Sequence, residues 1–208
     1  KYIHYDYVYY AKVLKNKKEY EKSNKNIEKA LTLDSTAVDL YRTLGENYQS
    51  LNNYDKAIEN YLILLDKGRV TLGDYQVLGQ TYYFAGTNLT SPQDSLKRVS
   101  YLLKADSMFS VVAEKAPSKP LGNFWRARAN SAIDQETTLG LAKPYYEAAL
   151  ALYEQDNKDT KKIIECYSYL GYYYFVKNEM AKSKEYWNKI LAIDPSNDTA
   201  IKALKGIK

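Results

Sequence analysis

The side chains that could carry out catalysis are few in this chain of 208 residues, which has one cysteine, Cys166, and one histidine, His4. A cysteine nucleophile needs a nearby base, and His4 lies at the opposite end of the sequence. Cys166 stands next to the aromatic residue Tyr167, on a helix face where a thiol is usually buried and unreactive. A single histidine and a single cysteine also exclude zinc clusters and internal disulfides. We predict a buried structural thiol.

Paired carboxylates are the other candidates for chemistry. Asp156 and Asp159 lie in the polar run from Glu154 to Thr160, which is typical of a solvated loop before a helix. Acid–base catalysis needs environments that separate two pKa values, and nothing in this run provides them. Phosphate-binding loops, metal motifs and dinucleotide fingerprints are absent from the sequence. We therefore predict no catalytic, cofactor-binding or metal residues, no cofactor, and a protein that is not an enzyme.

Composition and charge favour a folded domain and give little support to a nucleic-acid partner. The chain is 45% hydrophobic and 26% charged, which is the ordinary range for a packed core. Its 30 basic residues are interspersed with 25 acidic ones, a pattern that argues against a nucleic-acid partner. No apolar run approaches the roughly 20 residues of a membrane-spanning helix. We predict no membrane span in this segment.

A leucine-glycine pair recurs in a fixed context: tyrosine, two residues, Leu-Gly, two residues, tyrosine. The copies are Tyr41–Tyr48, Tyr75–Tyr82 and Tyr167–Tyr174, and the first two stand 34 residues apart. The spacing places the four residues on one stripe of a helix. Glycine costs about 1 kcal/mol relative to alanine inside a helix, so we expect a partner helix to approach closely at each glycine. Packing on such stripes accounts for most of the 23 tyrosines.

A second block follows each stripe, with a small residue four positions before an aromatic one. Its copies are Ala57 and Tyr61, Ala105 and Phe109, Ala142 and Tyr146, and Ser183 and Trp187. Polar turn residues separate the two blocks, for example Asn52-Asn53. Each unit is therefore a helical hairpin, and hairpins of this kind must stack to bury their apolar faces.

The two blocks together resemble the tetratricopeptide repeat (TPR), a 34-residue helical hairpin. The resemblance implies an all-α fold, an α–α superhelix in which about five hairpins and a C-terminal capping helix form one right-handed solenoid domain over residues 1–208. The repeats are expected at 4–37, 38–71, 72–119, 120–163 and 164–197, and the capping helix at 198–208. In the fourth repeat either Ala127 or Ala129 fills the small-residue position.

The third repeat carries an insertion near residues 85–98. Ser91-Pro92-Gln93-Asp94 has a capping serine, an early proline and an acidic residue, which predicts a helix start. The apolar spacing continues to Ala116, about two turns beyond a normal repeat helix. Two interpretations follow: a lengthened helix that packs on its own hairpin, or a protruding contact surface.

The resemblance also implies a function. In TPR proteins the first helices of the repeats line a concave groove. In this sequence the stripe of first-helix residues beside the packing face is polar in the middle of the chain and aromatic towards its end, which suits an extended peptide. We predict a non-catalytic protein–protein interaction scaffold that binds a peptide or protein partner in this groove. The alternative is a helical-repeat RNA-binding module, whose affinity for its ligand would fall strongly with added salt. The predicted groove residues are Lys12, Arg42, Glu46, Gln49, Gln76, Gln80, Tyr83, Tyr172 and Phe175. The asparagines of the chaperone-binding TPR clamp are missing at Lys12 and Glu46, so we reject that ligand.

The ends of the chain lead to two further expectations. The first helix is apolar on nearly every side, with Tyr2, Tyr5 and Tyr9 uncovered, so we expect a second copy, as a homodimer, or upstream repeats to cover it. The chain begins at Lys1 and is biased towards lysine, asparagine and tyrosine, which favours the C-terminal fragment of a longer bacterial protein. A location in the envelope or periplasm is slightly favoured over the cytoplasm.

Overall fold

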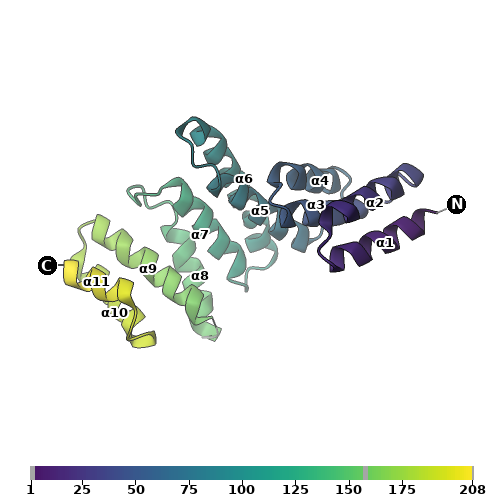
Figure 1. Cartoon of the computed structure of the whole chain (residues 1–208). Helices are drawn as coiled ribbons and strands as arrows, with labels where there is room; N and C mark the ends of the chain where they lie inside the picture. Colours follow the sequence, from purple (N-terminus) through teal and green to yellow (C-terminus); the bar gives the residue numbers. More distant parts are fainter. Residues whose placement is uncertain (1–2, 157–158, 208) are drawn as a thin grey trace. The chain divides into compact units, whose positions relative to one another are not determined.

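The computed structural model describes residues 3–156 and 159–207, and all regular elements within them are helices. The chain forms two compact units, Lys1–Tyr101 and Leu102–Lys208, which we describe one at a time. Figure 1 gives the order of the helices along the chain. The predicted all-α fold of helical hairpins is confirmed. The prediction that residues 1–208 form a single domain stays a prediction.

The first unit consists of two complete hairpins and the first helix of a third. α1 packs against α2 and α3 against α4, and contacts between α2 and α3 and between α4 and α5 join successive hairpins. The helices are α1 (His4–Asn16), α2 (Tyr20–Leu33), α3 (Leu40–Ser50), α4 (Tyr54–Asp66) and α5 (Leu72–Thr87).

Tight turns end the first helix of each of these hairpins, and the turn at Asn52 lies where the sequence predicts a break. Asn52 has a φ of 56° and Lys18 a φ of 62°. Asparagine tolerates this left-handed conformation better than most residues. The side chain of Asn53 then caps α4 by accepting a hydrogen bond from the backbone N–H of Lys56 at 3.3 Å.

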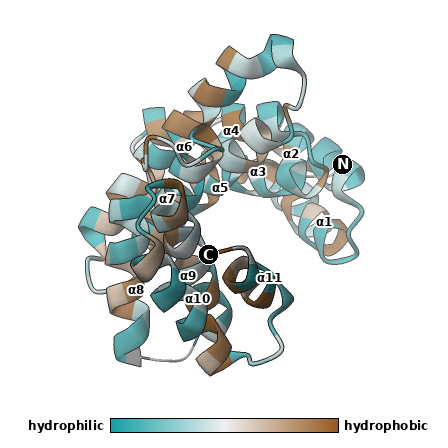
Figure 2. Cartoon of the chain, turned by 90° about the vertical axis from the view of Figure 1, so that its left-hand side faces the viewer, coloured by the Kyte–Doolittle hydropathy of each residue, from teal (hydrophilic) through white to brown (hydrophobic). Residues whose placement is uncertain are grey.

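The second unit begins within α6 and contains the remaining helices. Contacts join α7 to α8, α8 to α9, α9 to α10, and α10 to α11, and Figure 2 shows hydrophobic and hydrophilic residues alternating along these helices. The helices are α6 (Ser95–Lys115), α7 (Leu121–Ile133), α8 (Lys143–Asp156), α9 (Thr160–Val176), α10 (Met180–Ile193) and the predicted capping helix α11 (Asp198–Gly206). No helix among the described residues is long and apolar enough to cross a membrane.

The close approach expected at the signature glycines is present at Gly45 and Gly171. A Cβ atom added at Gly45 would lie 2.6 Å from the ring of Tyr61, and one at Gly171 would lie 2.8 Å from the ring of Trp187. Both rings come from the second helix of the same hairpin and are buried. In the last repeat the hydroxyl of Ser183 donates to the backbone carbonyl of Gly171 at 2.8 Å. The aromatic ring and the small residue before it therefore hold the two helices together.

The insertion forms a helix at the predicted place, with one difference at its start. A 3-10 turn (Pro92–Asp94) precedes α6, which has 21 residues against the 13 of α4. The hydroxyl of Ser91 does not cap the backbone as predicted, because it contacts the side chain of Gln93 instead. The hydroxyl of Tyr101 donates to Asp55 at 2.7 Å. The lengthened start of α6 thus rests on the beginning of α4.

The fourth hairpin departs most from the repeat. A long connection between α7 and α8 is held by Asp134, whose carboxylate accepts hydrogen bonds from the backbone N–H groups of Leu139 and Gly140 at 3.0 and 2.7 Å. Ala127 and Ala129 are both fully buried. Burial therefore leaves both assignments of the small-residue position open.

Candidate functional site

Cys166 and Asp159 occupy structural positions. Cys166 is buried in α9, and this burial raises the pKa of its thiol to about 12, so the thiolate is disfavoured at neutral pH. Asp159 caps α9 by accepting the backbone N–H of Lys162 at 3.2 Å. The predicted loop from Glu154 was too long, because α8 continues to Asp156. Residues 157–158 of that loop lie outside the described residues.

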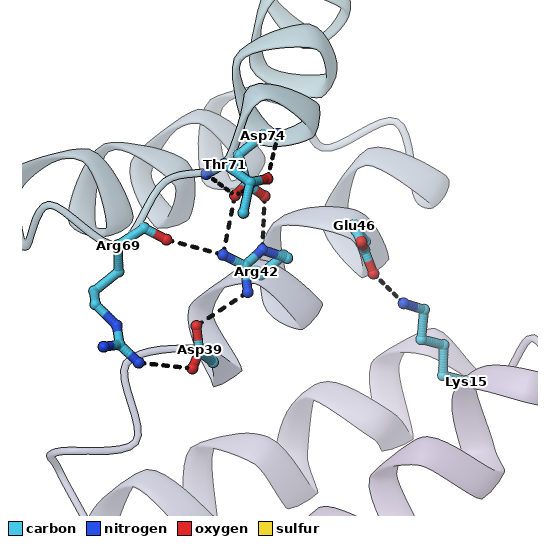
Figure 3. A network of polar contacts seen from close by, with 7 residues as sticks. All are labelled: Lys15, Asp39, Arg42, Glu46, Arg69, Thr71 and Asp74. Carbon is cyan, nitrogen blue, oxygen red and sulfur yellow. Dashed lines mark hydrogen bonds and ion pairs between the residues drawn. The ribbon is translucent and has the colours of Figure 1, made fainter.

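An ion-pair network in the first unit surrounds Arg42, one of the predicted groove residues (Figure 3). Its guanidinium binds the carboxylate of Asp74 in a bidentate manner, with Nε–Oδ1 and Nη2–Oδ2 distances of 2.6 and 2.9 Å. It also donates to Asp39 at 3.0 Å and to the backbone carbonyl of Arg69 at 2.9 Å. The polar groups of Arg42 are thus largely engaged within the chain.

Asp74 is the most buried member of this network, with 5% of its side chain exposed. Burial alone would raise the pKa of this carboxyl group, but hydrogen bonds from Arg42 and from Thr71 outweigh it and hold the pKa below its usual value. Thr71 and Asp74 also form a reciprocal capping box at the start of α5. The network therefore ties α3 to the N-terminus of α5, between two successive repeats.

The same use of ion pairs occurs at two other junctions. Glu46 on α3 pairs with Lys15 on α1. In the second unit, Arg128 on α7 binds Glu165 on α9 through two hydrogen bonds of 2.7 and 2.6 Å. Its guanidinium also lies 4.9 Å from the ring centroid of Trp125. Each pair joins the first helices of two neighbouring repeats.

The remaining predicted groove residues of the first unit make few polar contacts within it. Lys12 is exposed on α1. The side chains of three half-buried glutamines form no hydrogen bond with any described residue; they are Gln49, Gln76 and Gln80. Tyr83 is half-buried and packs edge-to-face on Phe84 with ring centroids 5.5 Å apart. Neutral amides are thus the polar groups of this stripe that are most available to a ligand.

In the second unit the predicted residues Tyr172 and Phe175 lie together on α9. Their rings are stacked with centroids 6.4 Å apart, and they are 41% and 42% exposed. They form one side of an apolar pocket of about 190 Å³. The pocket is completed by Trp187 and by residues of α11.

The sequence did not show which residues bind Arg42, Phe175 and their neighbours within the chain. The Thr71-x-x-Asp74 spacing is that of a capping box, so this motif could have been predicted. Nothing in the nearby sequence indicates that Asp74 also binds Arg42. Glu165 lies on the same repeat stripe as the predicted residues, yet Arg128 falls in the repeat whose register stayed open. The contribution of α11 to the pocket also depends on how that helix packs, which the spacing of its apolar residues does not show.

The N-terminal aromatic face is exposed in the structure. Tyr5 and Tyr9 are 75% and 72% exposed, while Tyr2 lies outside the described residues. What covers this face stays a prediction.

These features define a helical-repeat protein in which stacked hairpins are joined by ion pairs. The family model described as tetratricopeptide repeat matches residues 38–62. The crystal structure of the C-terminal part of a TPR repeat-containing protein from Cytophaga hutchinsonii is 32% identical, with a TM-score of 0.82, and the match covers 98% of this chain and 74% of that chain. The chain belongs to the tetratricopeptide repeat family.

Two more distant structures share the fold. YrrB, described as a TPR protein with an unusual peptide-binding site, is 23% identical with a TM-score of 0.64, over 96% of this chain and 90% of that one. A thermophilic TPR protein from Thermus thermophilus is 19% identical with a TM-score of 0.52, over 97% of each chain. Among curated protein sequences, none matches this chain significantly. The source organisms of the relatives suggest a bacterial origin. TPR proteins are generally non-catalytic scaffolds for protein interactions.

Proposed function

We propose that this chain is a non-catalytic interaction module that binds a peptide or protein partner on the exposed faces of its first helices. The observation that carries the proposal is the pair Tyr172 and Phe175, which present stacked, exposed rings beside an apolar pocket. Exposed aromatic side chains are frequent anchors of protein interfaces. YrrB supplies a precedent for peptide binding on a TPR fold.

In the first unit the proposal assigns ligand contact to neutral groups. Gln49, Gln76 and Gln80 can donate to and accept from the backbone of an extended peptide, and the ring of Tyr83 can contact its side chains. Arg42 and Glu46 have a different part in this proposal. Their charges pair with other repeats, so they position the helices that carry the glutamines.

A peptide library displayed on phage tests the proposal. Peptides selected on the purified chain should lose about thirtyfold or more in affinity for each of Tyr172 and Phe175 that is replaced by alanine, because an interface anchor contributes about 2 kcal/mol or more. The pair Gln80→Ala and Tyr83→Ala should weaken those peptides that bind the first unit. Circular dichroism of each variant checks that the helices are retained.

The matched control replaces two lysines away from these faces, Lys22→Ala and Lys184→Ala. Their loss should leave the measured affinities nearly unchanged. The proposal fails if the lysine variants abolish binding while the Tyr172/Phe175 and Gln80/Tyr83 variants keep full affinity by calorimetry. The partner would then bind another surface. A steep loss of affinity with added salt for RNA oligonucleotides would instead favour the RNA-binding alternative.

A further inference from the structure

The pocket between α9 and α11 has a defined size and an apolar lining. Its volume is about 190 Å³, while a cavity of about 150 Å³ is enough to hold benzene. Trp187 and Ile207 are buried at 5% and 6% exposure. The lining residues are Tyr172, Phe175, Trp187, Lys202, Ala203, Gly206 and Ile207. The pocket therefore has room for one large apolar side chain.

The wall on the α11 side contains a glycine with open space beside it. A Cβ atom added at Gly206 would have no heavy atom within 4 Å apart from its chain neighbours and the backbone of its own helix. The opposite wall consists of the rings of Tyr172 and Phe175, which stack on each other and remain about two-fifths exposed. An inserted side chain would cover these rings and remove apolar surface from water, which is the main source of favourable free energy in such contacts.

One charged side chain lines this pocket, Lys202. It is exposed and forms no ion pair with any residue that the structure describes. Lys205 is also exposed on α11 but does not line the pocket. An ammonium group without a partner beside an apolar pocket is complementary to a carboxylate that arrives with an apolar side chain.

We propose that the pocket between α9 and α11 binds a peptide segment in which one large apolar side chain adjoins an aspartate or glutamate. The apolar side chain enters between Tyr172 and α11, and the carboxylate accepts a hydrogen bond from Nζ of Lys202. This inference rests on the proposed function and specifies the chemistry of the partner at one of its faces.

Four labelled heptapeptides, acetylated and amidated at their ends, serve as probes in fluorescence anisotropy. The first is Ser-Ser-Asp-Phe-Asp-Ser-Ser, with a carboxylate on both sides because the direction of the bound peptide is open. The second has serine and the third lysine in place of both aspartates, and the fourth has alanine in place of phenylalanine. Replacing phenylalanine should weaken binding about tenfold or more. Serine flanks should weaken it about twofold to fivefold, and lysine flanks further.

A matched pair of variants tests the charge. Lys202→Gln should abolish the preference for aspartate over serine flanks, whereas Lys205→Gln, on the same helix but outside the pocket, should keep it. Gly206→Leu should fill the pocket and remove binding of the phenylalanine peptides without a steric clash. Circular dichroism and thermal melting of each variant confirm that α11 remains folded.

Several outcomes overturn the inference. Equal affinity for the aspartate and serine peptides would refute the acidic part, and binding unaffected by Gly206→Leu would refute the pocket. No measurable binding of the first peptide at millimolar concentration would also refute it. A dimer in sedimentation that Gly206→Leu disrupts would identify a second copy of the chain as the occupant instead.

The proposed function fails in a different experiment. If library-selected peptides depend on Tyr172 or Gln80 but not on Lys202 or Gly206, this inference is wrong and the interaction module stands. If no selected peptide depends on any first-helix residue, the proposed function itself is wrong.

Discussion

Replacing Gly45 by alanine should destabilise the first unit, although alanine is the better helix former. The added Cβ would lie 2.6 Å from Cε2 of Tyr61, well inside the normal contact distance. The ring cannot move aside easily, because Tyr61 is 1% exposed and Leu64, one turn further along α4, is fully buried. Overpacking of this kind costs about 1–3 kcal/mol, and the gain in helix propensity returns about 1 kcal/mol. We expect a net loss of up to about 2 kcal/mol.

Gly73→Ala is the matched control for this prediction. Gly73 lies in the first turn of α5, and a Cβ there would have only the hydroxyl oxygen of Thr71 nearby, at 3.5 Å. The change should therefore be neutral or stabilise the protein by up to about 1 kcal/mol. Urea unfolding followed by circular dichroism should show a lower midpoint for Gly45→Ala and an unchanged or higher midpoint for Gly73→Ala. Equal shifts of the same sign would refute the packing role of Gly45.

A double-mutant cycle locates the source of the strain. In a Tyr61→Leu background the ring is gone, so Gly45→Ala should cost less than it does in the parent chain. The coupling between the two changes should be about 1 kcal/mol or more, as for residues in direct contact. Additive free energies would mean that the two positions do not interact.

Four further predictions follow from individual groups. Tyr61→Phe should be neutral or slightly stabilising in urea unfolding, because the buried hydroxyl of Tyr61 has no hydrogen-bond partner among the described residues; a loss above about 1 kcal/mol would reveal a partner. Asp74→Asn should cost about 2 kcal/mol at neutral pH by breaking the bidentate bond to its arginine. The pKa of Asp74 is lowered in the folded chain. The ionised carboxylate therefore stabilises the fold above the ordinary carboxyl pKa of about 4, and this stabilisation is lost as the pH falls through the pKa of the folded chain. Asp74→Asn should accordingly lose less stability on acidification than the parent. Cys166 should resist alkylation by iodoacetamide in the native chain and react once it is unfolded, since burial raises its thiol pKa to about 12; rapid native labelling would contradict its burial. The chain should self-associate in sedimentation through its N-terminal face, and replacing Tyr5 and Tyr9 by serine should weaken that association; a strictly monomeric parent at high concentration would refute the self-association.

The hairpins were predictable because their determinants are local. The turn at Asn52-Asn53 and the glycine and aromatic positions of one hairpin lie within one repeat, so their spacing in the sequence is sufficient to place them. The extent of α8 was less predictable. The run from Glu154 contains no glycine or proline, and glutamate and glutamine are good helix formers. The polarity of these residues is therefore not sufficient to predict that the helix ends before them.

The candidate site was harder to predict, because its contacts join residues from different repeats. The bond between Arg42 and Asp74 depends on how one hairpin is offset against the next. The pocket beside Phe175 depends on the orientation of α11, whose apolar residues could pack in more than one way. Sequence spacing predicts a common stripe on the first helices, but it could not distinguish the residues paired within the chain from those available to a partner.

This distinction has a thermodynamic consequence for binding. The charged groups of the first-helix stripe join neighbouring repeats through Arg42 and Asp74, Glu46 and Lys15, and Arg128 and Glu165. A ligand that competes for one of these charges must first break a contact between repeats. This cost is largest at Arg42 and Asp74, because only 5% of Asp74 is exposed and its charge would be left uncompensated. Neutral amides and exposed rings carry no such cost. Ligand affinity on this protein should therefore reside in the glutamines and aromatic rings, while the ion pairs keep the helices that carry them in place.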